Sequence, residues 1–530
     1  MKYKTIPLFI AILMTGCGIT PSLSSEDSLP SETSTSQIPT SSSQEEPSTS
    51  QDELSTSEES STSFEESGRV DFNVYAINDL HGAIIDKNGN AGIAKTSTYL
   101  KAAREDNPNT LIISSGDMWQ GSSESNNTKG LLVTDWMNDV GFNAMTLGNH
   151  EYDWSDAYIT SNQAAAEFPM LAINLFDSNS DQRVSYAQPS VMVDMSGVQV
   201  GIIGAIGNVK NSILSTWVED VDFKTGYELT ELVKNESDKL KSEGADIIIY
   251  SLHDGFGNGG YTYPAQSSIS SLSSFDISSY YDSSLSNGYV DLVFEGHTHQ
   301  KTIYTDPFGV YHLQAGGYGE ALSYVNLTYD FDLKEMSVNE ADLVYTADMI
   351  DLDEDSYAAS LFSKYADMIG DIYSPIGYNA TTRYSNYLRQ VVADLYIEKG
   401  LEVWGEDYEI VLGGGYLNTR SPYSLEAGTI NVSMVQELFP FENNLELVAI
   451  RGGDLLDKFI NTSNSNYFTS YSEYGNSIRY SIDRGATYYI IVDQYTTAYG
   501  PNNLTLVEEM APRTYAYQLL VDYIKAGNLA

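Results

Sequence analysis

Short apolar runs and longer helical patterns alternate along the middle of the chain. Runs typical of buried strands occupy residues 70–77, 110–114, 144–147, 198–205, 245–251 and 290–294. Between the first three runs, residues 94–105 and 130–140 are predicted helices. Strands separated by helices predict an α/β domain with parallel strands.

Polar side chains follow five of these strands, at the point where each strand ends. Five of the six histidines of the chain lie there. The residues concerned are Asp79, His81, Asp117, Asn149, His150, His253, His297 and His299. Because ligands bind at the carboxyl ends of strands in open α/β sheets, this concentration of His, Asp and Asn predicts a metal site.

The residue types suit two divalent metal ions per chain. Asp117 has two carboxylate oxygens, enough to bridge ions about 3.5–4 Å apart. Asp79, His81 and His299 are expected to bind the first ion, and Asn149, His253 and His297 the second. Mixed nitrogen and oxygen ligands favour Zn, Mn, Co or similar metals over Ca or an all-oxygen Mg site.

The order of these motifs resembles that of a known family. The motifs are Asp-x-His at 79–81, Gly-Asp-x-x-Gln-Gly at 116–121, Gly-Asn-His-Glu-x-Asp at 148–153, the lone His253, and Gly-His-x-His at 296–299. Together they resemble the calcineurin-like metallophosphoesterases, in particular the secreted bacterial 5'-nucleotidase family. That family also includes UDP-sugar hydrolases and cyclic-nucleotide phosphodiesterases.

The resemblance implies a fold and an activity. It implies an N-terminal four-layer α/β/β/α sandwich that holds a dinuclear metal centre, followed by a second α/β domain that binds the substrate. It also implies that His150 is not a ligand but stabilises the phosphoryl group in the transition state or protonates the leaving group. Asp153 lies three residues further on, within reach of the imidazole, and would orient it.

The resemblance continues more loosely in the C-terminal part. Phe441 and Tyr495 match the two aromatic residues that stack on the base, and Asn443 matches a polar base contact, although both aromatics could instead belong to the core. Arg420 would contact phosphate, but the family's arginine follows the glycine triplet by two residues, where this chain has Leu417.

Two further features of this part bear on the substrate. Arg383 and Arg389 are additional candidates for phosphate contacts. The family's Gly-Gly-Asp-Gly, which supplies a carboxylate to ribose, is replaced by Ala-Tyr-Gly-Pro at 498–501.

We expect the domains to span residues 69–345 and 374–530. A connecting helix is expected within 346–373, because apolar residues of 356–372 recur at helical spacing. Residues 255–289, rich in Gly, Ser and Tyr, are interpreted as a surface loop or a lid, with a purely structural role equally open. His312 is expected to be a packed or surface residue rather than a ligand.

The N-terminus indicates export. Residues 1–17 have a basic start, an apolar run from Ile6 to Met14 that is too short to span a bilayer, and the only cysteine of the chain, Cys17. This arrangement resembles a bacterial lipobox, in which the cysteine is lipidated; the alternative is a cysteine within a signal peptide that is removed. Residues 18–68 contain no Lys or Arg and are rich in Ser, Thr and Glu, which predicts a disordered stalk. We therefore expect a lipid-anchored protein on the extracellular face of a bacterial membrane.

The charge limits the partners. A net charge of -46 argues against nucleic acid and leaves small phosphate esters, provided that bound cations supply positive charge. The first expectation is a hydrolase that converts nucleoside 5'-monophosphates to nucleoside and phosphate. UDP-sugars or 2',3'-cyclic nucleotides are the next candidates, and a non-catalytic binding lipoprotein on the same scaffold is the rival from another class.

Overall fold

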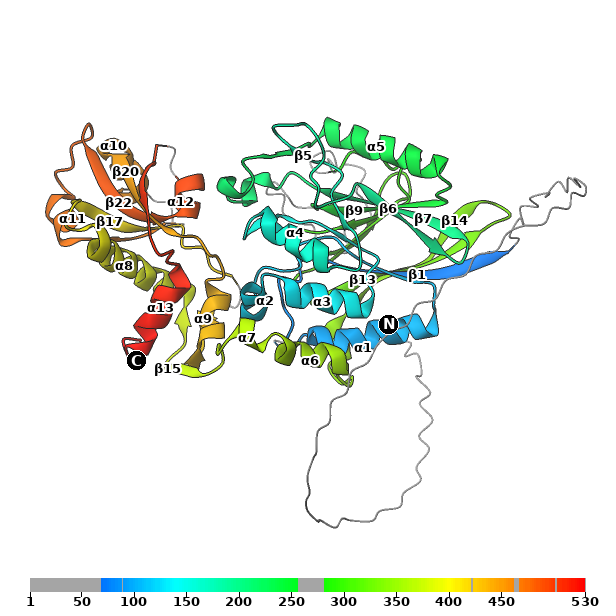
Figure 1. Cartoon of the computed structure of the whole chain (residues 1–530), viewed down its shortest axis with the longest axis horizontal. Helices are drawn as coiled ribbons and strands as arrows, with labels where there is room; N and C mark the ends of the chain where they lie inside the picture. Colours follow the sequence, from blue (N-terminus) through cyan, green and yellow to red (C-terminus); the bar gives the residue numbers. More distant parts are fainter. Residues whose placement is uncertain are drawn as a thin grey trace, which may run out of the picture. The chain divides into compact units, whose positions relative to one another are not determined.

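The N-terminal domain contains two six-stranded sheets (Figure 1). The computed structural model describes residues 68–87, 89–255, 281–420, 423–461, 467–500 and 503–529. The expected signal peptide and nearly all of the expected stalk lie outside these residues. So does most of the 255–289 segment. Within them, no helix has both the length and the apolar character needed to cross a membrane.

The first sheet has the strand order β14-β13-β1-β2-β3-β4. Its strands are β1 (Arg69–Ile77), β2 (Thr110–Ser114), β3 (Ala144–Thr146), β4 (Met170–Leu171), β13 (Ala321–Asp330) and β14 (Glu335–Tyr345). Strands β1 to β4 are parallel, and β13 and β14 add antiparallel strands at one edge.

The second sheet has the order β11-β12-β10-β9-β7-β6. Its strands are β6 (Ser190–Met195), β7 (Val198–Ile206), β9 (Ile247–His253), β10 (Leu292–Glu295), β11 (Lys301–Thr305) and β12 (Tyr311–Ala315). The four central strands are parallel, and the edge strands β6 and β11 are antiparallel. A small additional pair is formed by β5 (Leu175–Asp177) and β8 (Val221–Phe223).

An apolar layer joins the two sheets. Phe72 and Val74 of β1 lie in it with Ile202, Ile249 and Phe294 of the second sheet, all of them buried. The intervening residues of β1 face the other way, toward the helices, as the two-residue period of a strand requires. Because both faces of its second half are covered, β1 ends in an unbroken apolar run over residues 74–77.

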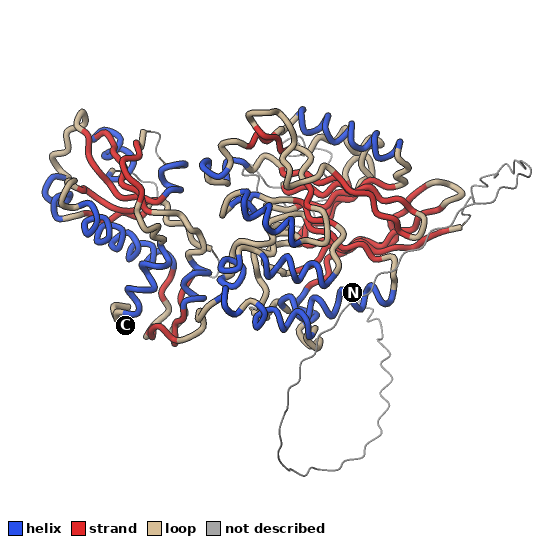
Figure 2. The backbone as a smooth tube through the Cα atoms, viewed as in Figure 1, coloured by secondary structure: helices blue, strands red, loops and turns tan. Residues whose placement is uncertain are grey.

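Helices cover the outer faces of both sheets (Figures 1 and 2). On the first sheet these are α1 (Gly92–Asp106), α2 (Ser123–Thr128), α3 (Leu131–Val140) and α4 (Asp156–Ala165), and on the second α5 (Tyr227–Ser242). Short 3-10 turns occupy Asn149–Tyr152, Lys210–Ser212, Ser215–Trp217 and Thr346–Met349. The arrangement confirms the expected α/β/β/α sandwich.

The single connecting helix expected over 356–372 is wrong. The structure has α6 (Ser356–Lys364) and α7 (Ala366–Ile369), separated at Tyr365, whose backbone leaves the helical region. The two pieces pack on different neighbours, α6 on α1 and α3 and α7 on α2. Gly370, with φ +71°, then ends α7.

The described end of the 255–289 segment is not a surface loop. Tyr281 and Leu285 are each only 2 % exposed and pack in the same apolar cluster as α5. The interpretation as a surface loop or lid is therefore wrong for these residues, because their apolar side chains complete the core beneath α5.

The C-terminal domain is built on a mixed five-stranded sheet of order β21-β17-β22-β20-β23. Its strands are β17 (Ile410–Gly415), β20 (Leu445–Arg451), β21 (Phe468–Tyr471), β22 (Thr487–Asp493) and β23 (Thr505–Glu509). Outside this sheet lie β15 (Pro375–Asn379), β16 (Arg383–Tyr384), β18 (Ser424–Leu425) and β19 (Gly428–Asn431). The helices are α8 (Ser385–Trp404), α9 (Val432–Leu438), α10 (Gly452–Asp454) with a π-helical continuation over Leu455–Ile460, α11 (Glu473–Ile478), α12 (Gln494–Tyr499) and α13 (Ala516–Lys525).

Candidate active site

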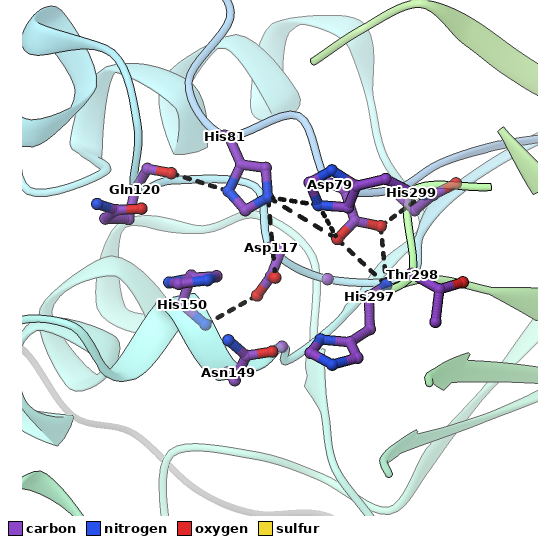
Figure 3. A network of polar contacts seen from close by, with 12 residues as sticks. Asp79, His81, Asp117, Gln120, Asn149, His150, His297, Thr298 and His299 are labelled. Atoms are coloured by element: carbon purple, nitrogen blue, oxygen red, sulfur yellow. Dashed lines mark hydrogen bonds and ion pairs between the residues drawn. The ribbon is translucent and has the colours of Figure 1, made fainter. Parts of the chain in front are cut away.

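The carboxyl ends of five strands, three from the first sheet and two from the second, place their polar residues together. Two groups result, and within each the possible ligand atoms all lie within 4.8 Å of one another. The groups are Asp79, His81 and His299, and Asp117, His253 and His297. Asn149, also buried, places its Oδ1 3.2 Å from Nε2 of His253 and so adjoins the second group. Figure 3 shows Asp79, His81, Asp117, Asn149, His297 and His299 converging.

The backbone at these residues is unusual. Asp79, His81, Asp117, His297 and His299 all have φ between +49° and +67°, the left-handed region that non-glycine residues rarely adopt. Each such residue costs on the order of 1–3 kcal/mol and persists only when its surroundings hold it. Backbone hydrogen bonds do so here, for example from the N–H of Asp79 to Gly116 (2.9 Å) and from that of His81 to Asp117 (3.0 Å). The fold therefore holds these side chains in place before any ligand binds.

A buried glutamate that the sequence analysis did not single out supports Asp117. The carboxylate of Glu151 accepts hydrogen bonds from the backbone N–H groups of Asp117 (2.9 Å), Met118 (2.8 Å) and Gly148 (2.7 Å). It thereby ties the loop after β2 to the loop after β3. The sequence did contain a signal for this role: Glu151 lies in the first turn after Gly148, where an acidic side chain can accept hydrogen bonds from free backbone N–H groups.

The ring nitrogens show what the first group can bind. Nδ1 of His81 donates to the carbonyl oxygen of Gln120 (2.9 Å), so the neutral ring carries its lone pair on Nε2. That Nε2 lies 3.0 Å from Nε2 of His299, which in turn lies 3.3 Å from Oδ1 of Asp79 (Figure 3). Nε2 of His81, Oδ1 of Asp79 and, in the tautomer protonated at Nδ1, Nε2 of His299 direct lone pairs at the same point, which a cation can occupy. The residues of this group therefore fit a divalent cation.

The second group has the same character. Nδ1 of His253 donates to the carbonyl oxygen of Ser115 (2.7 Å), and Nε2 faces Oδ2 of Asp117 at 3.2 Å. Burial alone would lower the pKa of His253, but the charge of Asp117 raises it to about 10. In the metal-free protein a proton therefore occupies the place of a cation. Burial, assisted by the charge of His253, lowers the pKa of His297 to about 4, which leaves this imidazole neutral and able to bind metal.

His150 lies beside both groups but belongs to neither. Its backbone N–H donates to Oδ1 of Asp117 (2.8 Å), and its Nδ1 lies 2.8 Å from Oδ2 of Asp153. Arg420 Nη2 donates to Nε2 of His150 at 2.6 Å. Since a guanidinium can only donate, Nε2 accepts, and the ring proton on Nδ1 is the one given to Asp153. The structure thus forms the expected His150–Asp153 pair, and its catalytic role stays a prediction.

Arg420 reaches the site despite its displacement in the sequence. The chain between the glycine triplet and Arg420 turns at Leu417, which is buried and has φ +46°. The guanidinium then lies 5.2 Å above the ring of Phe441, as well as beside His150. The three extra residues therefore change the path of the loop rather than remove the arginine from the site.

A cavity of about 180 Å³ opens next to His150. We call it the Phe441 cavity, because Phe441, Asn443 and Tyr495 line it together with His150 and Asp153. Trp154, Asn418 and Gln120, which the sequence analysis did not assign, line it as well. The three residues expected to bind the base thus border one space that adjoins the candidate metal groups.

Comparisons with known proteins agree with this geometry. Residues 72–301 match the calcineurin-like phosphoesterase family. The 5'-nucleotidase of Vibrio parahaemolyticus is 24% identical over 442 residues, which cover 72% of each chain. The 5'-nucleotidase precursor of Thermus thermophilus has the same fold, with a TM-score of 0.65 over 87% of this chain and 97% of that one, at 19% identity.

Residues 72–301 thus form a calcineurin-like phosphoesterase domain, and the chain is similar to the 5'-nucleotidases in sequence and in fold. The expected family, enzyme class and two-domain fold are thereby confirmed. The 5'-nucleotidase of Diplobatis ommata is a further relative, 26% identical over 432 residues that cover 72% of this chain and 69% of the relative. The endonuclease YhcR of Bacillus subtilis is 24% identical over 416 residues, 73% of this chain, but this chain spans only 32% of that protein.

Two arginines expected near phosphate are not brought to this part of the phosphoesterase. Arg383, in β16, places its guanidinium over the ring of Tyr387, 5.0 Å from its centre. Arg389, in α8, donates to the carbonyl oxygen of Tyr416 and stacks on Phe468 at 4.1 Å. Neither is among the residues that line the Phe441 cavity.

His312 is a packed residue, as expected. It is fully buried, with Nδ1 2.9 Å from Glu295 and Nε2 3.7 Å from Asp306, and its ring stacks on Tyr304. Burial alone would lower the pKa of His312, but the two carboxylates outweigh this effect and raise it. His312 therefore lies between two acids in the second sheet that favour its protonated form.

Proposed function

We propose that this phosphoesterase hydrolyses nucleoside 5'-monophosphates to nucleoside and phosphate. One observation supports this most directly: the Phe441 cavity adjoins His150 and the two candidate metal groups. A phosphate placed over the metal groups would leave its ester group pointing into a space bordered by two aromatic rings. A flat base suits such a space, and the relatives named 5'-nucleotidase agree with it.

Each residue of the site has a role in this proposal. Asp79, His81 and His299 would hold one cation, and Asn149, His253 and His297 a second, with Asp117 shared. Divalent cations in such sites supply Lewis acidity and positive charge toward phosphate oxygens. The chain supplies the rest: the guanidinium of Arg420, which lies beside Nε2 of His150, would meet charge that develops on the phosphate, and His150 would do so once Nε2 carries a proton. Asp153 keeps the imidazole in one orientation.

The base would be held by Phe441 and Tyr495, with Asn443 at its edge. A stacked base contributes roughly 1–3 kcal/mol. No carboxylate from β22 is available in place of the family's missing one, because Asp493 instead caps α12 by accepting from the N–H of Thr496. Ribose should therefore contribute less to binding than the base does.

Phe441→Ala tests the proposal. It should lower kcat/KM for AMP about 5- to 150-fold, the value of one base stack, mainly through KM. Activity on p-nitrophenyl phosphate should stay within about twofold, because this small ester reaches the site without the stack. Phe308→Ala is the control, since Phe308 is an exposed phenylalanine on the turn between β11 and β12.

Two results would contradict the proposal. Equal losses on both esters would mean that the substitution acted through the fold or through Arg420, which packs on Phe441, and not through a base. No loss on either would mean that the Phe441 cavity does not bind a base, and would favour a phosphate ester without a nucleoside.

We also propose that the enzyme works at the outer face of a bacterial membrane. The support is the sequence alone: Cys17 after an apolar run, then the Ser/Thr/Glu-rich stalk of residues 18–68, with catalytic and substrate domains over 69–345 and 374–530. Cys17→Ala should move the full-length protein from the membrane fraction to the medium. Unchanged membrane association of this variant would exclude the anchor.

A further inference from the structure

Residues 437–442 carry Phe441 from the end of α9 toward β20, and side chains of the phosphoesterase domain hold this segment. α9 packs on α2, a helix of that domain. The contacts with the segment are made at Glu437, Pro440 and Glu442. The side chains of the phosphoesterase domain that make them are Lys87, Gln120, Asn126 and Lys129. The position of Phe441 therefore depends in part on residues outside its own domain.

The carbonyl oxygen of Pro440, directly before Phe441, accepts two hydrogen bonds. The donors are Nε2 of Gln120 (3.2 Å) and Nδ2 of Asn126 (3.3 Å), and both of these side chains are buried. Oδ1 of Asn126 accepts from the backbone N–H of Gly121 (2.9 Å), so the amide is oriented with its Nδ2 toward Pro440. The proline ring also restricts its own φ to about −65°. The backbone that leads into Phe441 is thus held in one place.

On the other side of Phe441, the carboxylate of Glu442 pairs with Lys129. Nζ of Lys129 lies 2.8 Å from each carboxylate oxygen, and the two side chains are only 22 % and 15 % exposed. The ammonium also lies 4.9 Å from the centre of the Trp154 ring, which is a cation–π contact. The carbonyl oxygen of Lys129 accepts from Nδ2 of Asn162 (2.8 Å), which fixes the lysine backbone. Sheltered pairs that engage both carboxylate oxygens hold a position, whereas exposed pairs contribute little.

Lys129 does not border the Phe441 cavity itself. Glu442 and Trp154 are among the described residues that line this cavity, and Lys129 is not. Glu442 directly follows Phe441, whose ring centre lies 6.2 Å from that of His150. A shift of Glu442 would therefore move the aromatic ring relative to the phosphate site, without changing the groups that act on the phosphate.

A second ion pair between the domains, that of Lys87 with Glu437, provides a comparison. It lies on the same segment, but Glu437 precedes Phe441 by four residues and belongs to α9. The side chain of Lys87 is also more exposed, at 39 %. A role in joining the domains would be common to both pairs, whereas a role in placing Phe441 would be specific to the pair of Lys129.

We propose that Lys129 is a positioning residue, which holds Phe441 through Glu442 at the place where the ring stacks on the base. This inference rests on the proposed function, in which the base of the substrate occupies the Phe441 cavity. Loss of the Lys129 charge should therefore weaken the use of nucleotides and leave the reaction of small phosphate esters unchanged.

The test measures kcat and KM of the full-length, metal-loaded enzyme on AMP and on p-nitrophenyl phosphate. Lys129→Met removes the charge and keeps most of the side-chain length. It should raise KM for AMP at least about threefold, and no further than Phe441→Ala does, with kcat within about twofold of wild type. Both constants for p-nitrophenyl phosphate should stay within about twofold. Lys129→Arg should keep KM for AMP within about twofold of wild type, because a guanidinium also binds both oxygens of a carboxylate.

Further variants keep the test decisive if Lys129→Met does not fold. Glu442→Gln removes the charge of the other partner and should raise KM for AMP as much as Lys129→Met, within about twofold. Lys87→Met is the matched control and should leave KM for both esters within about twofold of wild type. Glu442→Gln added to Phe441→Ala should leave KM for AMP within about twofold of that of Phe441→Ala alone, because both substitutions remove the same stack.

The outcomes separate the two claims. An unchanged KM for AMP in folded Lys129→Met or in Glu442→Gln, alongside a raised KM in Phe441→Ala, would overturn this inference and leave the proposed function standing. An equal rise in Lys87→Met would also overturn it, because the two pairs would then only join the domains. So would equal losses on p-nitrophenyl phosphate, or a further rise when Glu442→Gln is added to Phe441→Ala. Absence of AMP hydrolysis, or an unchanged KM for AMP in Phe441→Ala, would overturn the proposed function and this inference with it.

Discussion

Replacing Asp153 by asparagine removes the charge that orients His150 while keeping the shape of the side chain. In the structure, Nδ1 of His150 donates to Oδ2 of Asp153 over 2.8 Å, and each side chain is only 16–17 % exposed. The only other polar partner of this ring is Arg420, at Nε2, among the hydrogen bonds of the described residues. The orientation of the imidazole thus depends largely on one charge-assisted hydrogen bond.

The size of the effect follows from that bond. Hydrogen bonds to charged groups contribute about 1.5–3 kcal/mol, and the asparagine retains at most a neutral one. If the lost energy appears in the transition state, kcat falls about 10- to 150-fold. His150→Asn should lose more, about 10²–10⁴-fold, because it removes the acting group rather than its orienting partner.

The assay is kcat for AMP and for p-nitrophenyl phosphate, with the metal content measured on the same samples. Both variants should retain the metal content of the wild type, and both substrates should lose kcat equally, because His150 acts on the phosphoryl group common to them. Asp156→Asn is the matched control, since Asp156 lies three residues further on, is exposed, and should show no effect.

Two results would refute this reasoning. Loss of metal in His150→Asn would make His150 a ligand. A larger loss of kcat in Asp153→Asn than in His150→Asn would mean that Asp153 acts on the substrate itself rather than through the imidazole.

Two further predictions concern the metal groups and the buried acids. His253→Gln should lower the metal content from near two ions per chain to near one. It should also reduce AMP hydrolysis more than about 100-fold, which exceeds the usual effect of replacing a residue that only hydrogen-bonds to a ligand. An unchanged metal content, measured by elemental analysis, would show that His253 is not a ligand. His312→Gln should lower the free energy of unfolding by about 3–5 kcal/mol at pH 6, because it leaves Glu295 and Asp306 buried without their cation. Since the folded protein raises the pKa of His312, this stabilisation is complete below about 6.5, the ordinary histidine pKa, and is lost as the pH rises through the folded value. Urea unfolding at pH 6 and pH 9 should therefore show a difference between wild type and His312→Gln that shrinks at pH 9, and a difference that grows would contradict the assignment.

The grouping of the candidate metal residues could be predicted because it follows from topology. Parallel strands direct their carboxyl ends to one edge of a sheet, and β1, β2, β3, β9 and β10 all carry His, Asp or Asn just beyond that edge. The edges of the two sheets meet because the sheets face each other. This arrangement was expected from the family resemblance and not from periodicity. The left-handed backbone at Asp79 and His297 was not predictable, because it is imposed by contacts distant in the sequence.

Other parts of the site could not be predicted for similar reasons. The position of Arg420 depends on how the loop turns at Leu417, whereas spacing alone left its role open. Glu151 acts through backbone groups of another loop, and such contacts leave no pattern in its own neighbourhood. The cavity lined by His81, Tyr318 and Glu437 is formed by residues from both domains, so no single stretch of sequence carries its signal.

The break between α6 and α7 shows the limit of periodicity. Leu361 and Ile369 are both buried at helical spacing, which supported one helix, but the helices that carry them, α6 and α7, pack on different helices. Periodicity records which residues are buried and not whether they face the same partner. A turn at Tyr365 satisfies the same pattern as a continuous helix.

The central claim is that this phosphoesterase releases phosphate from nucleoside 5'-monophosphates at a two-metal site. The most direct test measures inorganic phosphate released from AMP and metal content in the same preparation, purified without chelator. The account predicts near two transition-metal ions per chain, phosphate release from AMP, loss of both on chelation, and recovery of both when Mn²⁺ is added. Two bound ions without phosphate release from AMP, or full phosphate release with no metal present, would contradict it.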